Sequence, residues 1–324
     1  MNVSFVIRTY NEEKYIEEVI KKIKAQATNH DIEIIIVDSE STDGTVEISR
    51  KLGAKIVHIT KSEWSWGRSL NKGIEASNSD YIAIISGHCI LASDQWVETS
   101  IHTIQEGYDA IYGRQIPIKG LDYFEEYELF KWYPDIDLCK LSIKNQTGIS
   151  NAACFMKREA WNQVKFDEEA QSMEDGIWAT TAIKLGLRVG YTSRTCLYHS
   201  HPFDAEYTYR KWYSRTLAGL RYADILFSGN KIYKTKRLIK RHLFILIIIK
   251  NSLLELIDFQ YFFKENKAVS FKAACYFILL KYYAIIKSQQ SYNKNINVKY
   301  WGVQQSNRLM TNISNNLNGM FQKK

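Results

Sequence analysis

The sequence predicts an α/β fold in which helices flank a mostly parallel sheet, followed by a helical C-terminal region. Two short apolar runs, at residues 3–8 and 32–37, read as strands buried on both faces. Each run gives way to small polar residues and then to a helical pattern, which is the strand–helix alternation of a parallel sheet. Near residue 205 the composition becomes basic and aromatic. This change predicts a domain at residues 1–204 and a second region at 205–324.

The run at residues 32–37 ends at a carboxylate, Asp38, and the small polar residues at 39–45 follow it. Ligands of open parallel sheets bind beyond the carboxyl ends of the strands, so Asp38 lies where a ligand would be. Asp43 or Thr42 can cap the helix that begins near Thr45. A purely structural interpretation, in which a turn and a helix cap follow the strand, accounts for the Asp43–Gly44 pair. It gives no reason for a carboxylate at the end of the strand, at Asp38.

The first strand, VSFVIR, leads into Thr9-Tyr10-Asn11-Glu12-Glu13 and a helix to about Lys24. Together with IIIVDSESTDGTVEI, it resembles the start of the inverting nucleotide-sugar glycosyltransferases of family 2, which have the Rossmann-like GT-A fold. The resemblance covers about residues 2–202. It implies a nucleoside diphosphate sugar donor, most often a UDP-sugar. The donor contacts that it implies here are Thr9, Asn11, Glu12, Asp38 and Ser41.

A third strand is predicted at residues 54–59, before the segment WSWGRSLNKGIEAS at 64–77. In the resembled family, this position carries a helix start that lies along the donor diphosphate. Gly67, Arg68 and Asn71 match it. Arg68 can grip phosphate oxygens with two N–H groups, at a helix start where anions bind readily. Its alternative role is a surface arginine. Trp64 and Trp66 either pack a loop or touch a sugar, and we expect at least one in the core.

The fourth predicted strand, residues 80–91, carries the clearest departure from the family. Where family members have an Asp-x-Asp motif for a divalent cation, this chain has Ser86-Gly87-His88-Cys89. Hard cations such as Mg²⁺ prefer oxygen ligands, whereas manganese or zinc tolerates imidazole. We therefore expect Ser86, Gly87 and His88 at the donor, with Mn²⁺ or Mg²⁺ use open. A metal-free enzyme in which a protonated His88 neutralises phosphate is the alternative.

The resemblance places the reaction centre at Glu174 and Asp175, where the family has a Glu-Asp motif whose Asp is the general base. Partial burial and a neighbouring carboxylate would raise the pKa of such a base. Acidic residues in a first helical turn also stabilise the helix dipole, and both roles are compatible. Asn151 and Trp178 are the acceptor contacts. His199, and after it His201, is expected to return to the diphosphate or its metal. The resemblance also implies a strand at 147–157, just before the catalytic turn. Strands at 109–117 and 188–192 complete the predicted sheet, and no site residue is assigned to 121–141.

The cysteine pattern and the lengths of the apolar runs predict where in the cell the protein is found. The chain has five cysteines without CxxC spacing, no basic leader and no apolar run near the roughly 20 residues of a membrane span. These features predict a cytoplasmic protein.

The net charge of +8 conceals an asymmetry. From residue 206 onward there are 21 Lys and Arg against 5 Asp and Glu, and residues 230–242 hold six of these basic residues. Basic amphipathic helices can lie on an anionic membrane, on the inner face of the cell membrane in this case. Nucleic acid is disfavoured because no recognition motif accompanies the charge. A dimerising helical lid is the third interpretation. We expect residues 293–324 to be partly disordered.

The combined prediction is an inverting glycosyltransferase that acts on a glycan or lipid-linked acceptor, as in bacterial surface polysaccharide or capsule synthesis. The main alternative is a nucleotide- or sugar-binding module that has lost catalysis, which the missing Asp-x-Asp makes conceivable. A dinucleotide oxidoreductase is disfavoured because no GxGxxG follows the first strand.

Overall fold

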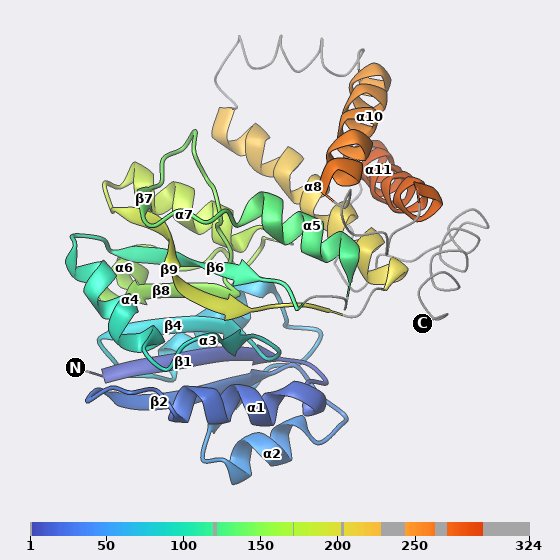
Figure 1. Ribbon diagram of the computed structural model, residues 1–324. Helices are drawn as coiled ribbons and strands as arrows, with labels where there is room; N and C mark the ends of the chain where they lie inside the picture. Colours follow the sequence, from blue (N-terminus) through green and yellow to red (C-terminus); the bar gives the residue numbers. More distant parts are fainter. Residues whose placement is uncertain are drawn as a thin grey trace. The chain divides into compact units, whose positions relative to one another are not determined.

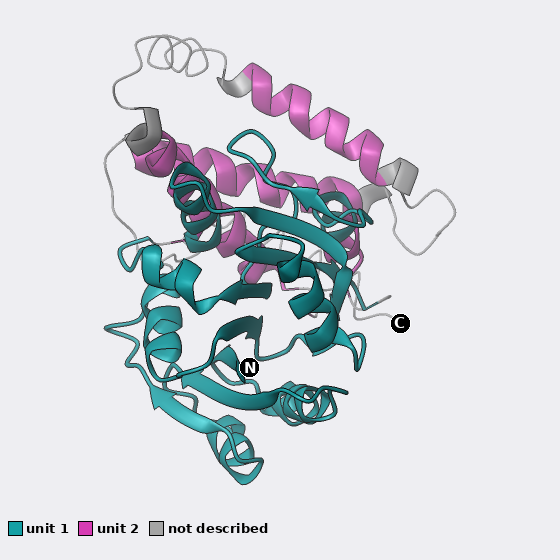
Figure 2. Ribbon diagram, turned by 90° about the vertical axis from the view of Figure 1, so that its left-hand side faces the viewer, with its two compact units in different colours: residues 1–120, 128–170, 174–200 teal, residues 121–127, 171–173, 201–324 magenta. Residues whose placement is uncertain are grey.

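A computed structural model describes residues 2–118, 122–170, 172–201, 204–227, 244–262 and 271–293. The chain divides into two compact units, coloured separately in Figure 2. The first comprises residues 1–120, 128–170 and 174–200, and the second comprises 121–127, 171–173 and 201–324. The main change of unit, between residues 200 and 201, lies close to the predicted boundary between 204 and 205.

The first half of unit 1 alternates strands and helices, as the apolar periodicity predicts. The elements are β1 (Asn2–Thr9), α1 (Glu13–Lys24), β2 (Asp31–Asp38), α2 (Thr45–Lys51), β3 (Lys55–His58), α3 (Trp66–Glu75) and β4 (Tyr81–Ser86). Strand β1 pairs in parallel with β2 and β4, and β2 pairs in parallel with β3. Figure 1 shows β2, β1 and β4 side by side. The predicted helix over 13–24 and the start of a helix at Thr45 are confirmed.

The second half of unit 1 adds both parallel and antiparallel strands. Its elements are β5 (Ile90–Leu91), α4 (Trp96–Gln105), β6 (Ala110–Ile116), β7 (Cys139–Lys140), β8 (Ala153–Lys157), α6 (Arg158–Gln163), α7 (Glu174–Lys184) and β9 (Val189–Tyr198). Strand β8 lies antiparallel between β4 and β6, and β6 pairs in parallel with β9. The strand order is β3-β2-β1-β4-β8-β6-β9-β5, and β7 pairs with β9. This is the predicted mostly parallel sheet flanked by helices.

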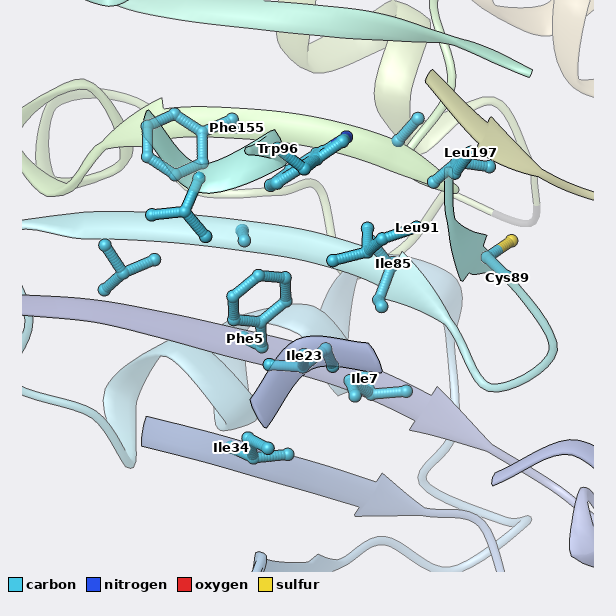
Figure 3. Packing of buried hydrophobic residues seen from close by; sticks show 14 of the residues in the cluster. Phe5, Ile7, Ile23, Ile34, Ile85, Cys89, Leu91, Trp96, Phe155 and Leu197 are labelled. Atoms are coloured by element: carbon cyan, nitrogen blue, oxygen red, sulfur yellow. The ribbon is translucent and has the colours of Figure 1, made fainter. Parts of the chain in front are cut away.

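Alternation along the central strands builds a core on each face of the sheet. Phe5 and Ile7 of β1 face one core, while Val6 faces the other. The first core, part of which Figure 3 shows, receives Ile23 from α1 and Trp96 from α4. The second receives residues from α3, α6 and α7. Because both faces are covered, the strands read as continuous apolar runs rather than as alternating ones.

One strand is shorter than expected. The fourth strand was predicted over residues 80–91, but β4 stops at Ser86, and the N–H of Cys89 donates to the Ser86 carbonyl across a turn (3.0 Å). The chain then continues as β5, which pairs with β9. The turn presses against the loop after β1, since a Cβ on Gly87 would lie 2.8 Å from Cγ of Glu12. Only glycine fits there without a shift of its neighbours.

Unit 2 is helical, as predicted for the C-terminal region. It contains α8 (Ala205–Phe227), α10 (Phe244–Phe262), α11 (Phe271–Asn293) and the first half of α5 (Tyr123–Trp132). Its core stacks Phe124 on Phe277 with ring centroids 4.1 Å apart, and Phe259 packs beside both. The buried ammonium of Lys281 pairs with Glu255 and lies 3.8 Å from the Trp212 ring centroid. The basic run at 230–242 and residues 294–324 lie outside the described residues.

None of the helices in the described part of the chain combines the length and the apolar character needed to span a bilayer.

Asp122 at the start of α5 makes the stability of unit 2 depend on pH. Its Oδ1 accepts from the N–H groups of Phe124 (2.8 Å) and Glu125 (3.3 Å). Burial, and then the Glu125 carboxylate, raise the pKa of Asp122 to about 7. The folded state therefore holds a proton that the unfolded chain releases near pH 4, so this group's contribution falls as pH rises from about 4 to 7.

Asp122→Asn keeps the cap and removes the charge. We expect it to stabilise unit 2 by about 1–3 kcal/mol at pH 8 and by less at pH 5, measured by urea unfolding at both values. The control is Asp204→Asn, because Asp204 caps α8 through Tyr207 N–H (2.9 Å) and is exposed. Equal gains at both pH values would contradict the prediction.

Candidate active site

The strand pairing brings the polar strand ends to one edge of the sheet. Strands β1, β2, β4, β6 and β9 run in the same direction, because β8 reverses between β4 and β6. Their carboxyl ends therefore share an edge, where Thr9, Asp38, Ser86 and His199 emerge. The amino end of the reversed β8 reaches the same edge, just after Asn151. Side chains from five separate strands can thus form one site.

Asp38 is fixed in a network of neutral donors. Its side chain is buried, and its carboxylate accepts from Thr9 Oγ1 (3.0 Å), Ser41 Oγ (2.5 Å) and Ser41 N–H (3.0 Å). Asn11, with a φ of 55°, donates its N–H to Ser41 Oγ (2.9 Å) and accepts from Thr42 N–H (2.9 Å). The loops after β1 and β2 therefore interlock, and four of the predicted donor contacts lie together.

A chain of four polar side chains crosses the edge from β1 to β6. Glu12 Oε1 lies 2.7 Å from His88 Nδ1, and His88 Nε2 lies 3.1 Å from His199 Nε2. His199 Nδ1 in turn lies 2.5 Å from Gln115 Oε1. Two of the three histidines that the sequence singles out, His88 and His199, are thus in contact, although 111 positions separate them in the chain. Both rings are partly buried.

Arg8, the penultimate residue of β1, holds the start of α7. Its guanidinium donates to Glu174 Oε1 (3.1 Å), and both side chains are largely buried. It also donates to the carbonyl of Trp66 (3.2 Å) and lies 4.7 Å from the Trp66 ring centroid. Asn151 donates to the same Glu174 oxygen (3.3 Å). Glu174 is therefore fixed by a basic partner and an amide.

Asp175, the second carboxylate of the pair, is half-buried at the start of α7. Its Oδ1 accepts from the N–H of Gly176 (2.7 Å), and its carbonyl accepts from the Tyr112 hydroxyl (3.4 Å). The helix N-terminus stabilises its negative charge. The carboxylate of Glu174 is thus neutralised by Arg8, while that of Asp175 reaches the surface.

The predicted diphosphate segment is occupied by protein partners. Arg68 pairs with Glu168 (2.9 Å) and Glu169 (3.3 Å), and the hydrogen bond to Glu168 raises its pKa. Asn71 binds Glu168 Oε1 (3.0 Å) and the backbone of Phe166. A Cβ on Gly67 would lie 2.1 Å from the Asp167 carbonyl oxygen. All three residues pack against the loop at 166–169, so a phosphate would compete with two carboxylates for Arg68.

The predicted acceptor contacts differ in position. Asn151 lies at the site, and its buried Oδ1 has no hydrogen-bond partner among the described residues. Trp178 is buried in the second core, where its indole N–H donates to the Val164 carbonyl (2.6 Å). Trp64 packs against that core and contacts Trp66 edge-on at 4.7 Å.

No site role was predicted for Arg8 or Gln115. Each is a polar residue near the carboxyl end of its strand, which is the feature that indicated Asp38. In β6 the polar Arg114 stands beside Gln115, so this pattern does not single out Gln115.

Comparisons with known proteins agree with this geometry. A family model described as glycosyl transferase family 2 matches residues 4–164. An O-antigen chain rhamnosyltransferase of Salmonella typhimurium, RfbN, is 24% identical over 226 residues, covering 66% of this chain and 71% of the relative.

Two solved structures share the fold. The mannosyltransferase PcManGT from Pyrobaculum calidifontis, solved with GDP-Man and Mn²⁺, gives a TM-score of 0.59 at 13% identity over 91% of this chain and 88% of that chain. S. aureus TarS residues 1–349, solved with UDP, gives 0.51 at 17% identity over 91% and 92%.

A divalent cation, which the resembled family holds with its Asp-x-Asp motif, fits the residues present here in part. Where an Asp-x-Asp motif would stand, Cys89 is buried in the first core and is unsuited to coordinate an ion at the edge. His88 and His199 supply two adjacent imidazole nitrogens instead. Imidazole suits manganese or zinc better than magnesium.

Arg8 and Glu174 should be strongly coupled in stability. Arg8→Met keeps apolar contact with Trp66 but leaves the Glu174 charge buried without its cation, which we expect to destabilise unit 1 by about 3–5 kcal/mol. The double variant with Glu174→Gln should recover part of this loss, as measured by urea unfolding. Arg50→Met, at an exposed position of α2, is the control. Strictly additive effects of the two substitutions would show that the pair does not interact.

Proposed function

Because this chain belongs, through residues 4–164, to glycosyl transferase family 2, we propose that it transfers a sugar from a nucleoside diphosphate donor to a hydroxyl group with inversion. The acceptor is a glycan or a lipid-linked glycan of bacterial surface polysaccharide or capsule synthesis, a choice supported by the rhamnosyltransferase relative of the O-antigen chain.

The observation that carries this proposal is the different environment of two adjacent carboxylates. Glu174 is buried against Arg8, whereas Asp175 is half-buried at the edge where the strand ends meet. Glu174 is buried against Arg8, so it has a structural role and fixes the first turn of α7. Asp175 is only half-buried at the edge, where an acceptor hydroxyl can approach, and we assign it as the general base.

The reaction is a single displacement. The acceptor oxygen attacks the anomeric carbon of the donor sugar while its proton passes to a carboxylate oxygen of Asp175. The bond from the anomeric carbon to the diphosphate oxygen breaks, and the nucleoside diphosphate leaves with the electron pair. A divalent cation, when bound by His88 and His199, supplies positive charge to the leaving diphosphate.

The donor nucleoside binds at the interlocked loops after β1 and β2. Thr9, Asn11 and Ser41 hold Asp38 in one orientation, so its carboxylate is preorganised to accept hydrogen bonds from a base. Uridine is the base we favour. Ser86 and Gly87 line the approach of the diphosphate to His88, while Gly67, Arg68 and Asn71 support the neighbouring loop.

The enzyme also binds an anionic membrane surface peripherally, through α10. Four apolar side chains lie along one face of this helix, and each is more than half exposed: Leu246, Ile249, Leu253 and Ile257. Their spacing of three to four residues places them on a single stripe. Lys250 lies within the stripe and can extend its ammonium towards lipid headgroups. The basic run at 230–242 precedes α10 directly, so charge and apolar surface adjoin in sequence.

A second candidate function is a binding module without catalysis. The missing Asp-x-Asp motif is the observation in its favour. A binding module would bind the donor without turnover, whereas the enzyme would do both. Measuring donor binding and turnover of the unaltered protein therefore distinguishes the two.

Asp175→Asn should reduce turnover about 10²- to 10⁴-fold and leave donor binding within twofold. The assay is release of nucleoside diphosphate from UDP-, GDP- and thymidine diphosphate sugars, with binding measured by calorimetry. Asp94→Asn, at an exposed position, is the control. Turnover within tenfold of the unaltered enzyme would remove Asp175 as the base. Donor binding without turnover in the unaltered protein would favour the binding module.

Membrane contact is tested by cosedimentation with vesicles. The protein should bind vesicles containing phosphatidylglycerol, bind pure phosphatidylcholine weakly, and lose binding at high salt. Leu253→Glu with Ile257→Glu should reduce binding at least tenfold. The matched control is Leu279→Glu, an exposed leucine of α11. If the double variant instead converts a dimer into a monomer without changing vesicle binding, the α10 face contacts a second copy and the membrane proposal is wrong.

A further inference from the structure

Arg8 uses only part of its hydrogen-bonding capacity inside the protein. A guanidinium has five N–H groups, two of them on Nη1. The two on Nη1 are engaged, one with the Trp66 carbonyl (3.2 Å) and one with Glu174 Oε1 (3.1 Å). Within the described ranges of the chain, the N–H groups on Nε and Nη2 have no hydrogen-bond partner. Part of this cation is therefore available to a ligand.

The unused donors of Arg8 are open to solvent. In the part of the chain that the structure describes, the fully buried polar atoms without a partner do not include Nε or Nη2 of Arg8. The 12% of the side chain that is exposed therefore includes these donors. A largely buried cation is costly unless its donors are satisfied, and a bound anion would satisfy them.

The strand pairing places Arg8 between the two ends of the proposed donor site. Strand β1 lies between β2, which ends at Asp38, and β4, which ends at Ser86. Nη1 of Arg8 holds Glu174, which directly precedes Asp175. A donor that binds its nucleoside at Asp38 and presents its sugar to Asp175 must carry its diphosphate across the end of β1. Arg8 stands at this crossing.

Arg8 is also less neutralised than Arg68, the arginine that the sequence indicated for the diphosphate. Arg68 pairs with Glu168 and Glu169. Arg8 pairs with a single carboxylate among the described residues, and through one nitrogen only. Arginine binds phosphate through two parallel N–H groups, and Nε with Nη2 forms such a fork. The unused side of Arg8 thus has the charge and the geometry that a phosphate needs.

We propose that Nε and Nη2 of Arg8 bind the sugar-linked phosphate of the donor, while Nη1 keeps Glu174 in place. The guanidinium then stabilises the negative charge that develops on the departing diphosphate. One side chain connects the leaving group to the helix that carries the base. This inference rests on the proposed transferase function and adds a substrate-binding residue to it.

Calorimetry with UMP and UDP in the presence of Mn²⁺ tests this assignment, because only UDP carries the second phosphate. Guanosine nucleotides replace this pair if the protein binds GDP instead. Arg8→Lys keeps a cation for Glu174 but loses the fork, so UDP should bind at least tenfold more weakly and UMP within twofold. Glu174→Gln keeps an oxygen for Nη1 and removes the opposing charge, so UDP should bind at least threefold more tightly, with UMP again within twofold.

The matched control is Arg50→Lys, at an exposed position of α2, which should change neither affinity. Retained UMP binding shows that a variant is folded. A purely structural Arg8 would alter UMP and UDP binding together, so UDP affinity that follows UMP affinity in both variants, or changes in neither, would overturn the assignment and leave the transferase proposal intact. If the unaltered protein binds none of UDP, GDP and thymidine diphosphate, the donor site itself is wrong, and the assignment fails with it.

Discussion

The ion pair between Arg8 and Glu174 joins the end of the first strand to the first turn of α7. Arg8 belongs to the first strand, which is paired on both sides and cannot move independently of the sheet. Glu174 belongs to the first turn of α7, 166 positions later in the chain. Each charge is largely removed from water, and the pairing offsets part of the cost of burying both. The pair therefore holds the first turn of α7, and Asp175 with it, against the end of β1.

The same pair explains why adjacent carboxylates can have different roles. Two acidic residues side by side would repel if both were exposed to the same environment. Arg8 and Asn151 donate hydrogen bonds to the Glu174 carboxylate. The N–H groups at the start of α7 stabilise the negative charge of Asp175. These different environments agree with the proposed roles, in which Glu174 fixes the helix start and Asp175 is the base. The arrangement depends on packing around α7 rather than on the two residues themselves.

Much of the fold of unit 1 could be predicted from the sequence, because local patterns of apolar and polar residues determine its strands. Apolar runs that are bounded by polar turns define β1, β2 and β3 within a residue or two, and a polar residue at the end of a buried strand marks Asp38 and His88 as candidates. Contacts between residues that are distant in the sequence could not be predicted. Nothing near Arg8 indicates its partner at 174, and nothing near Arg68 indicates that the loop at 166–169 supplies its carboxylates. The reversal of β8 and the break at Gly87 likewise depend on strands and loops distant in sequence.

Strand β9 has a consequence for the order in which the molecule can be made. It pairs with β6, β5 and β7, so three strands that leave the ribosome earlier have no partner on that side until residues 189–198 emerge. His199 follows directly, and His88 therefore waits for more than a hundred further residues before it meets the other imidazole. Contacts of such long sequence separation form slowly and late. A nascent chain that stops before this point leaves β5, β6 and β7 without their β9 partner, and unpaired strand edges are prone to pair with other chains.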